Sequence, residues 1–216
     1  IQEDDARRLA EFGALVQQSF SRNLATGAQA MDLDGSSDPK RSVTAGSAEN
    51  AMHQASAAVD GDAKTWWQPL AGQNRASLEI DLGKIQKANL LELREAISEG
   101  QRIEKYFVEG WTGSGWTWMC EGNAVGNRAL RRFAEIEVSR LRIHITSSRL
   151  HPTLAEVGLY LAPVLLNKPA IEKLPSGKIR IRGQAGVEIR YTVDGTEPGP
   201  QSLLYTSPFE LSTPQI

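Results

Sequence analysis

The decapeptide Ala58-Val-Asp-Gly-Asp-Ala-Lys-Thr-Trp-Trp67 is the stretch that decides how this chain folds. It places the acidic residues Asp60 and Asp62, the turn residue Gly61 and the Thr65 hydroxyl close together. Calcium takes about six to eight oxygen ligands, and a tight loop can supply several from carbonyls and side chains. Asp60 and Thr65 offer the best side-chain oxygen ligands for calcium, and Asp62 can offer its carbonyl or its carboxylate oxygen. Because Asp-Gly-Asp is also common in ordinary β-turns, the surrounding sequence must decide between a calcium loop and a plain turn.

Alternating apolar residues on both sides of this loop predict β-strands. The segment Leu78-Glu-Ile-Asp-Leu-Gly83 alternates apolar and acidic residues, and Leu141, Ile143 and Ile145 repeat the pattern with basic neighbours. Residues 106–118 are predicted to form a hairpin, because two aromatic-rich runs flank a turn with two glycines. Such strands and turns favour a sandwich or jelly roll over a βαβ fold.

Residues 4–22 are predicted to form one amphipathic helix. Leu9, Phe12, Val16 and Phe20 recur at spacings of three and four, which places them on one face. A single helix cannot stably bury such a stripe alone. We therefore expect it to pack against another part of the protein, either in this sequence or upstream of it.

Composition excludes several classes of protein. The 216 residues carry a net charge of -2 and have a pI of about 6.0. They therefore lack the excess of positive charge that is typical of nucleic-acid-binding domains. No apolar run approaches the roughly 20 residues that span a membrane. The single cysteine, Cys120, excludes an intrachain disulfide, and we expect it to be a small buried apolar residue.

The last fifty residues predict a smaller β domain. Lys178–Arg182 and Val187–Val193 alternate again, and the turn Asp194-Gly195 follows the second run. Too few strands follow to close a sandwich. Both ends of the sequence look cut, so we expect a piece of a longer polypeptide. The expected division is a helix over 1–22, a sandwich over 23–163 and a truncated domain over 164–216.

The loop, the Leu78–Gly83 strand and the distal Ala155-Glu-Val157 together resemble the discoidin-like (coagulation-factor type C) β-sandwich. That fold is a jelly roll, and its bacterial members include family 32 carbohydrate-binding modules. The resemblance implies a structural calcium ion that ties the first strands to the last. It assigns the ligands to three carbonyls and three side chains: the carbonyls of Ala57, Asp62 and Ala155, and the side chains of Asp60, Thr65 and Glu156.

Two flanking regions resemble parts of bacterial family 29 α-L-fucosidases. Residues 9–25 look like the last helix of the catalytic barrel and its exit, and residues 93–103 look like the sandwich that follows the barrel. Tyr191–Pro198 with Leu204–Phe209 resembles the immunoglobulin-like C-terminal domain of chitobiases and β-hexosaminidases.

This resemblance implies a non-catalytic accessory region of a periplasmic or extracellular bacterial fucosidase. The region would support the barrel of its own polypeptide and could also bind glycan. No (β/α)₈ barrel is present, so this piece alone is not expected to cleave a glycosidic bond. The alternative is an independent, calcium-stabilised carbohydrate-binding or adhesion module, because a fold does not fix a function.

A sugar site would combine an exposed aromatic ring with polar side chains. Trp67 and Trp116 are expected in the core, Trp66 is expected at the surface because it alternates with Trp67, and Trp118 is undecided. If the sandwich binds sugar, the ligand would be a fucosylated or galactosylated glycan; the other reading is a structural spacer with no ligand but calcium. The polar candidates lie in predicted loops, where each of them is equally explained as a solvated residue: His53, Asn74, Arg75, Arg94, Glu95, Gln101 and Arg102.

Overall fold

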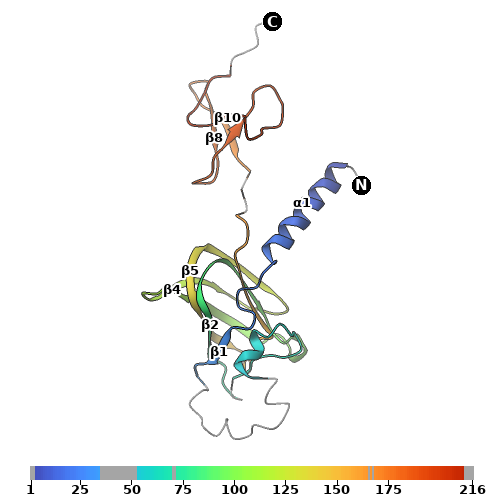
Figure 1. Ribbon diagram of the computed structural model, residues 1–216, viewed down its shortest axis with the longest axis vertical. Coiled ribbons are helices and arrows are strands. Elements are labelled where there is room, and N and C mark those ends of the chain that lie inside the picture. The colour runs from blue at the N-terminus through green and yellow to red at the C-terminus, as the bar shows by residue number, and fades with distance from the viewer. Residues whose placement is uncertain (1–2, 35–52, 70–71, 165, 167, 212–216) are drawn as a thin grey trace. The chain divides into compact units, whose positions relative to one another are not determined.

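The computed structural model describes residues 3–34, 53–69, 72–164, 166 and 168–211 (Figure 1). These residues divide into two compact units, Ile1–Pro163 and Val164–Ile216. The first unit opens with helix α1, Glu3–Ser19, which ends three residues before the predicted end at residue 22. No helix among the described residues is both long and apolar enough to cross a membrane.

The first unit is a jelly-roll sandwich built around two long strands. Strand β2 pairs with β5 along most of its length, and the register breaks between Asp81 and Gln86, so the two strands contribute to both layers. The strand order is β1-β2-β5-β3-β4, and β6 pairs with the second half of β2. The strands are β1 Gln29–Asp32, β2 Ala76–Arg94, β3 Ile103–Trp111, β4 Trp116–Gly122, β5 Ala129–Ser148 and β6 Glu156–Tyr160.

The core lies between the layers and follows the predicted alternation. Leu78, Ile80, Leu141 and Ile143 are fully buried, and Trp67 is only 1% exposed. The predicted hairpin is present as β3 and β4. The prediction of an all-β sandwich with one N-terminal helix is therefore confirmed.

The second unit contains two short strand pairs. Strand β7, Ala170–Lys173, pairs with β8, Ile179–Arg182, while β9, Arg190–Tyr191, pairs with β10, Leu203–Leu204. The runs Lys178–Arg182 and Val187–Val193, which predicted this smaller β domain, do not form one sheet, because β8 and β9 are not partners in the described residues. A bridge from Ile179 to Phe209 and the stacking of Phe209 on Tyr191, with ring centroids 4.4 Å apart, join the two pairs instead.

Candidate functional site

The loop of residues 58–67 folds around the carboxylate of Asp60. One oxygen of Asp60, Oδ1, accepts a hydrogen bond from the Asp62 amide at 2.8 Å, and Oδ2 accepts one from the Thr65 hydroxyl at 2.6 Å. The Thr65 amide donates to the Asp62 carbonyl at 3.0 Å. The Asp62 carboxylate instead accepts from the Lys64 amide at 3.0 Å. The two predicted side-chain ligands, Asp60 and Thr65, are thus hydrogen-bonded to each other.

Glu156 brings a second carboxylate to this loop from the start of β6. Its Oε1 is buried and has no hydrogen-bond partner. Burial and the negative charge of Asp60 raise the pKa of Glu156 to about 7. A hydrogen bond from the Gly61 backbone and the positive charge of Arg94 act in the opposite direction but are weaker. A buried oxygen without a partner beside a second acidic group is an unfavourable arrangement that a cation would relieve.

The remaining predicted ligands are the carbonyls of two buried alanines that lie close to Asp60 and Glu156 in the sequence. Ala57 is 3% exposed at the loop, and Ala155, next to Glu156, is 2% exposed. Within the described residues, no three His, Cys, Asp or Glu side chains converge as a metal cluster. A cation here would therefore depend on carbonyl and hydroxyl oxygens in addition to Asp60 and Glu156, which is the donor chemistry of calcium and not of zinc.

The polar residues predicted for a sugar site are not gathered into one place. The His53 ring lies against Trp66, with ring centroids 4.4 Å apart and the planes tilted by 45°, and Trp66 is partly exposed, as expected. Asn74 and Arg75 are exposed. Gln101 is also exposed and lines a separate hollow of about 310 Å³.

Three of these residues are occupied by contacts within the sandwich. Glu95 is 3% exposed, and both of its oxygens accept backbone hydrogen bonds. Arg102 is 8% exposed and donates to the carbonyls of Glu99 and His151. Arg94 donates to Glu92 at 2.6 Å. Glu95 and Arg102 therefore differ from the expectation of solvent-facing loop residues, because their polar groups hold neighbouring loops together.

The outer face of the sheet carries an aromatic cluster that the sequence did not point to. Arg142 lies 4.0 Å from the ring centroid of Trp116, and Trp116 meets Trp111 edge to face. Glu79, only 7% exposed, accepts from both Arg140 and Arg142, at 3.1 and 2.8 Å. Trp116 is partly exposed, so its predicted place in the core was wrong. The alternation of basic and core residues in β5 indicated that arginines lie on this face. It could not indicate that Trp116 and Glu79 lie beside them, because those residues come from other strands.

Trp118 is the most exposed of the tryptophans described by the structure, at 59%. Cys120 is buried as expected, and burial raises the pKa of its thiol to about 11. A thiol with that pKa stays protonated and unreactive near neutral pH.

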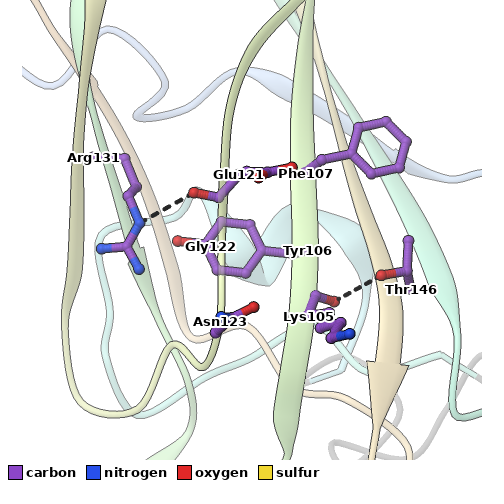
Figure 2. A pocket seen from close by; sticks show the side chains of 8 residues that line it. All are labelled: Lys105, Tyr106, Phe107, Glu121, Gly122, Asn123, Arg131 and Thr146. Carbon is purple, nitrogen blue, oxygen red and sulfur yellow. Dashed lines mark hydrogen bonds between the residues drawn. The ribbon is translucent and has the colours of Figure 1, made fainter.

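A hollow of about 500 Å³ opens beside the first residues of β3 and the last residues of β4 (Figure 2). Its polar lining includes Lys105, Tyr106, Asn123 and Arg131. None of these residues was a sequence candidate, because they come from two strands and a loop that only the fold brings together.

Comparison with known families decides the classification. A family model described as the F5/8 type C domain matches residues 42–157, which include the Asp60 loop and end just after Glu156. The chain belongs to the F5/8 type C domain family. A second family model, the chitobiase/beta-hexosaminidase C-terminal domain, matches residues 174–216 behind the F5/8 type C domain. Both resemblances seen in the sequence are confirmed.

Similar proteins contain the F5/8 type C domain within longer chains. Alpha-L-fucosidase 1 of Arabidopsis thaliana is 32% identical over 164 residues, which are 74% of this chain and 30% of that protein. The structure of SpGH29 matches at 29% identity with a TM-score of 0.64, over 76% of this chain and 33% of SpGH29. A Ruminococcus gnavus GH29 fucosidase in complex with fucose matches at 26% identity with a TM-score of 0.64, over 76% of this chain and 31% of that one.

This chain spans about a third of the length of the relatives that it matches. It is homologous to the C-terminal region of GH29 α-L-fucosidases.

Proposed function

We propose that this chain is the non-catalytic accessory region of an α-L-fucosidase, which supports the catalytic barrel of the same polypeptide. Homology to the C-terminal region of GH29 fucosidases supports this assignment. The buried carboxylates Glu79, Glu92 and Glu95 also support it, because arginines or backbone amides already occupy them. A retaining glycosidase needs two carboxylates facing a substrate, about 5 Å apart.

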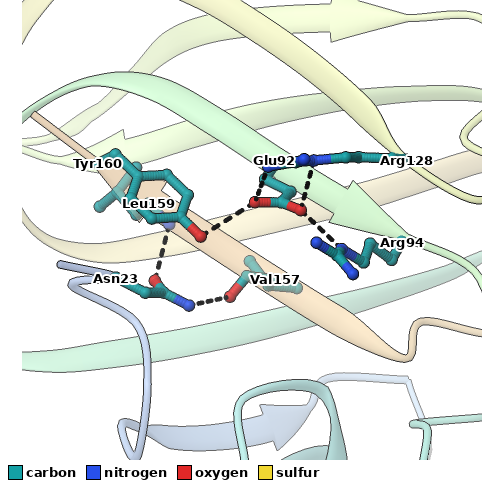
Figure 3. Close-up of polar contacts among 7 residues, drawn as sticks. All are labelled: Asn23, Glu92, Arg94, Arg128, Val157, Leu159 and Tyr160. Atoms are coloured by element: carbon teal, nitrogen blue, oxygen red, sulfur yellow. Dashed lines mark hydrogen bonds and ion pairs between the residues drawn. The ribbon is translucent and has the colours of Figure 1, made fainter. Parts of the chain in front are cut away.

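The segment that leaves α1 is fastened to the sandwich at several points (Figure 3). The Asn23 side chain accepts from the Leu159 amide at 3.0 Å and donates to the Val157 carbonyl at 3.2 Å. Just before it, Phe20 packs edge to face on Tyr160, with ring centroids 5.0 Å apart. The exit of α1 is therefore a fixed part of the domain.

Beneath Phe20, a buried ionic network holds Tyr160 in place. Glu92 is 3% exposed and accepts from Arg94 at 2.6 Å, Arg128 at 2.8 Å and the Tyr160 hydroxyl at 3.0 Å (Figure 3). Arg128 also lies 4.5 Å from the Phe20 ring centroid. These contacts connect the residues at the end of α1 to β2, to β6 and to the loop before β5.

The observation that carries the proposal is the uncovered apolar face of α1. Leu9, Phe12 and Val16 form the predicted stripe, and they are 62%, 64% and 39% exposed. Such a stripe is stable in water only when another surface covers it. Because the relatives are more than twice as long as this chain, we assign the stripe to contact with their preceding catalytic region.

We further propose that a structural calcium ion closes the sandwich at Asp60 and Glu156. The buried Oε1 of Glu156 and the Asp60–Thr65 pair support this site. When bound, calcium would supply a positive charge that binds the loop to the start of β6. Extracellular calcium-binding modules have a Kd of roughly 10⁻⁴–10⁻³ M, so a site of that kind would be filled in the periplasmic or extracellular location that we propose.

The stripe on α1 allows a direct test. In the chain as given, Phe12→Ser should leave the melting temperature of the sandwich within about 1 °C of the Glu11→Ser control, because both side chains are exposed. In the longer protein that includes the upstream region, Phe12→Ser should cost about 3 kcal/mol or more, as a buried aromatic does. Thermal melts of both lengths measure the difference. An equal effect of Phe12→Ser in both lengths would refute the assigned contact.

Catalysis provides the second test. The chain as given should not release 4-nitrophenol from 4-nitrophenyl α-L-fucopyranoside, whereas the longer protein should release it. Hydrolysis by the isolated chain, or failure of an active longer protein to accept any α-L-fucoside, would contradict the proposal. The second result would favour an independent carbohydrate-binding or adhesion module.

A further inference from the structure

The hollow of Figure 2 contains a buried polar group that nothing in the chain satisfies. Tyr106 is 3% exposed, and its hydroxyl oxygen is buried without a hydrogen-bond partner. Burial raises the pKa of Tyr106, so the hydroxyl keeps its proton and can donate. Buried donors without partners are uncommon and unfavourable in folded proteins. An acceptor from outside the chain would satisfy this donor.

A cation without a carboxylate partner lies beside this hydroxyl. Figure 2 shows the Tyr106 hydroxyl directed toward Arg131. The Arg131 Nε donates to the Glu121 carbonyl at 3.3 Å and Nη1 to the Leu130 carbonyl at 2.9 Å. Its Nη2 makes no hydrogen bond with a described residue. The guanidinium is thus oriented by the backbone while one amino group stays available.

Gly122 packs closely against both groups. A Cβ atom at Gly122 would lie 2.5 Å from the Tyr106 hydroxyl oxygen and 2.7 Å from the Arg131 Nη2. These distances are shorter than any real contact of that kind, so a side chain at Gly122 would displace one of the two donors. The two donors and Gly122 therefore form one cradle.

The charge balance of the hollow is positive. Lys105 also lines it, and neither Lys105 nor Arg131 forms an ion pair with a described carboxylate. By contrast, Arg140 and Arg142 on the neighbouring face are both paired with Glu79. The carboxylate in the lining belongs to Glu121, whose side chain extends toward Phe107 and away from Arg131 (Figure 2).

We propose that this hollow binds a sugar-sized ligand through an oxyanion, a carboxylate, sulfate or phosphate group, held by Arg131, Lys105 and the Tyr106 hydroxyl. The guanidinium fork and the hydroxyl are suited to planar or tetrahedral oxyanions. The volume of about 500 Å³ exceeds that of one oxyanion and falls in the range of roughly 300–1,000 Å³ for small-molecule sites. Asn123 and Thr146, at the rim, offer an amide and a hydroxyl to the uncharged part of the ligand.

Calorimetric titration of the chain with matched sugars tests this site. The probes are glucuronate, glucose 6-sulfate and glucose 6-phosphate, with glucose as the neutral control, at low and high ionic strength. At least one charged sugar should bind 10-fold or more tightly than glucose, and added salt should weaken its binding. The sugar that binds best identifies which oxyanion the site prefers, and each of the three results supports the proposal.

Variants separate this site from non-specific attraction. Arg131→Gln should weaken binding of the preferred sugar roughly 10-fold or more, and Lys105→Gln and Tyr106→Phe roughly 3-fold each. Lys105 is exposed, so its variant keeps the test valid if Arg131→Gln fails to fold. Arg132→Gln is the matched control, because Arg132 lies outside this hollow and donates to the Pro163 carbonyl. Equal binding of glucose, no binding of any charged sugar, or unchanged binding by Arg131→Gln and Lys105→Gln would overturn the proposal.

Discussion

Glu95→Ala is expected to destabilise the sandwich by about 3–9 kcal/mol, since each of three buried amides would lose its acceptor at about 1–3 kcal/mol. The Glu95 Oε1 accepts from the amides of Arg102 and Ile103 at 2.6 and 2.8 Å, and Oε2 accepts from Gly126 at 2.6 Å. These three amides belong to the start of β3 and to the loop before β5. No water can replace the carboxylate easily, because Glu95 is only 3% exposed. Urea unfolding monitored by tryptophan fluorescence measures the loss.

Two controls separate the hydrogen bonds of Glu95 from its charge and its position. Glu95→Gln keeps one acceptor oxygen and should fall between the wild type and Glu95→Ala. Glu104→Ala removes an exposed carboxylate that bonds to the Ser147 and Arg149 side chains, and should cost far less than Glu95→Ala, because surface ion pairs contribute little. If Glu95→Ala proved no more harmful than Glu104→Ala, the three amides would not depend on this carboxylate.

Removal of calcium is expected to have the second largest effect. Calcium at about one hundred times its dissociation constant would stabilise the sandwich by about 2.7 kcal/mol. For a domain of this size that corresponds to a fall in melting temperature of roughly 5–10 °C in chelator. Added calcium should restore the transition, and Glu156→Gln should abolish the response to calcium. Arg75→Gln, an exposed change away from the loop, is the matched control and should keep the full response.

The stabilisation by calcium should depend on pH, and the protonation of Glu156 determines whether it rises or falls. Burial and Asp60 raise the pKa of Glu156 from an ordinary 4.5 to about 7 in the metal-free fold. The folded state then binds this proton more tightly than the unfolded state, so metal-free stability from this group is complete below about pH 4.5 and is lost as the pH rises through 7. Calcium should therefore stabilise the protein more at pH 8 than at pH 5. Melts in chelator and in calcium at both pH values measure this.

Strand positions were predictable because one face of each strand is buried. The alternation of Leu78 and Ile80, and of Leu141 and Ile143, locates the core faces correctly. The helix was equally visible from its spacing. The second unit was less predictable, because Val187–Val193 forms only the two-residue strand Arg190–Tyr191 and pairs with β10.

Side-chain roles that depend on strand register were not predictable. Trp116 lies opposite Trp111 in the β3–β4 pair, and the register shifts between Val108 and Glu109. This shift places Met119 and Cys120 in the core and leaves Trp116 on the outer face with Arg142. No local pattern reports such a bulge.

Polar residues were the hardest to assign from the sequence. Glu95 looked like a free loop carboxylate because the three amides that it accepts from lie 7, 8 and 31 residues further along the chain, at spacings that follow no regular pattern. Asp60 and Glu156 could be connected only through a known family, since no spacing rule links a loop to a strand so far away. The cradle of Tyr106, Gly122 and Arg131 gave no signal, because ordinary strand residues form it.

A calorimetric titration of calcium into the metal-stripped chain at pH 8 tests the central claim, a sandwich closed by a cation at Asp60 and Glu156. We predict one calcium ion bound per chain by the wild type and loss of that binding in both Asp60→Asn and Glu156→Gln. Absence of binding to the wild type, or binding that survives in both variants, would contradict the account.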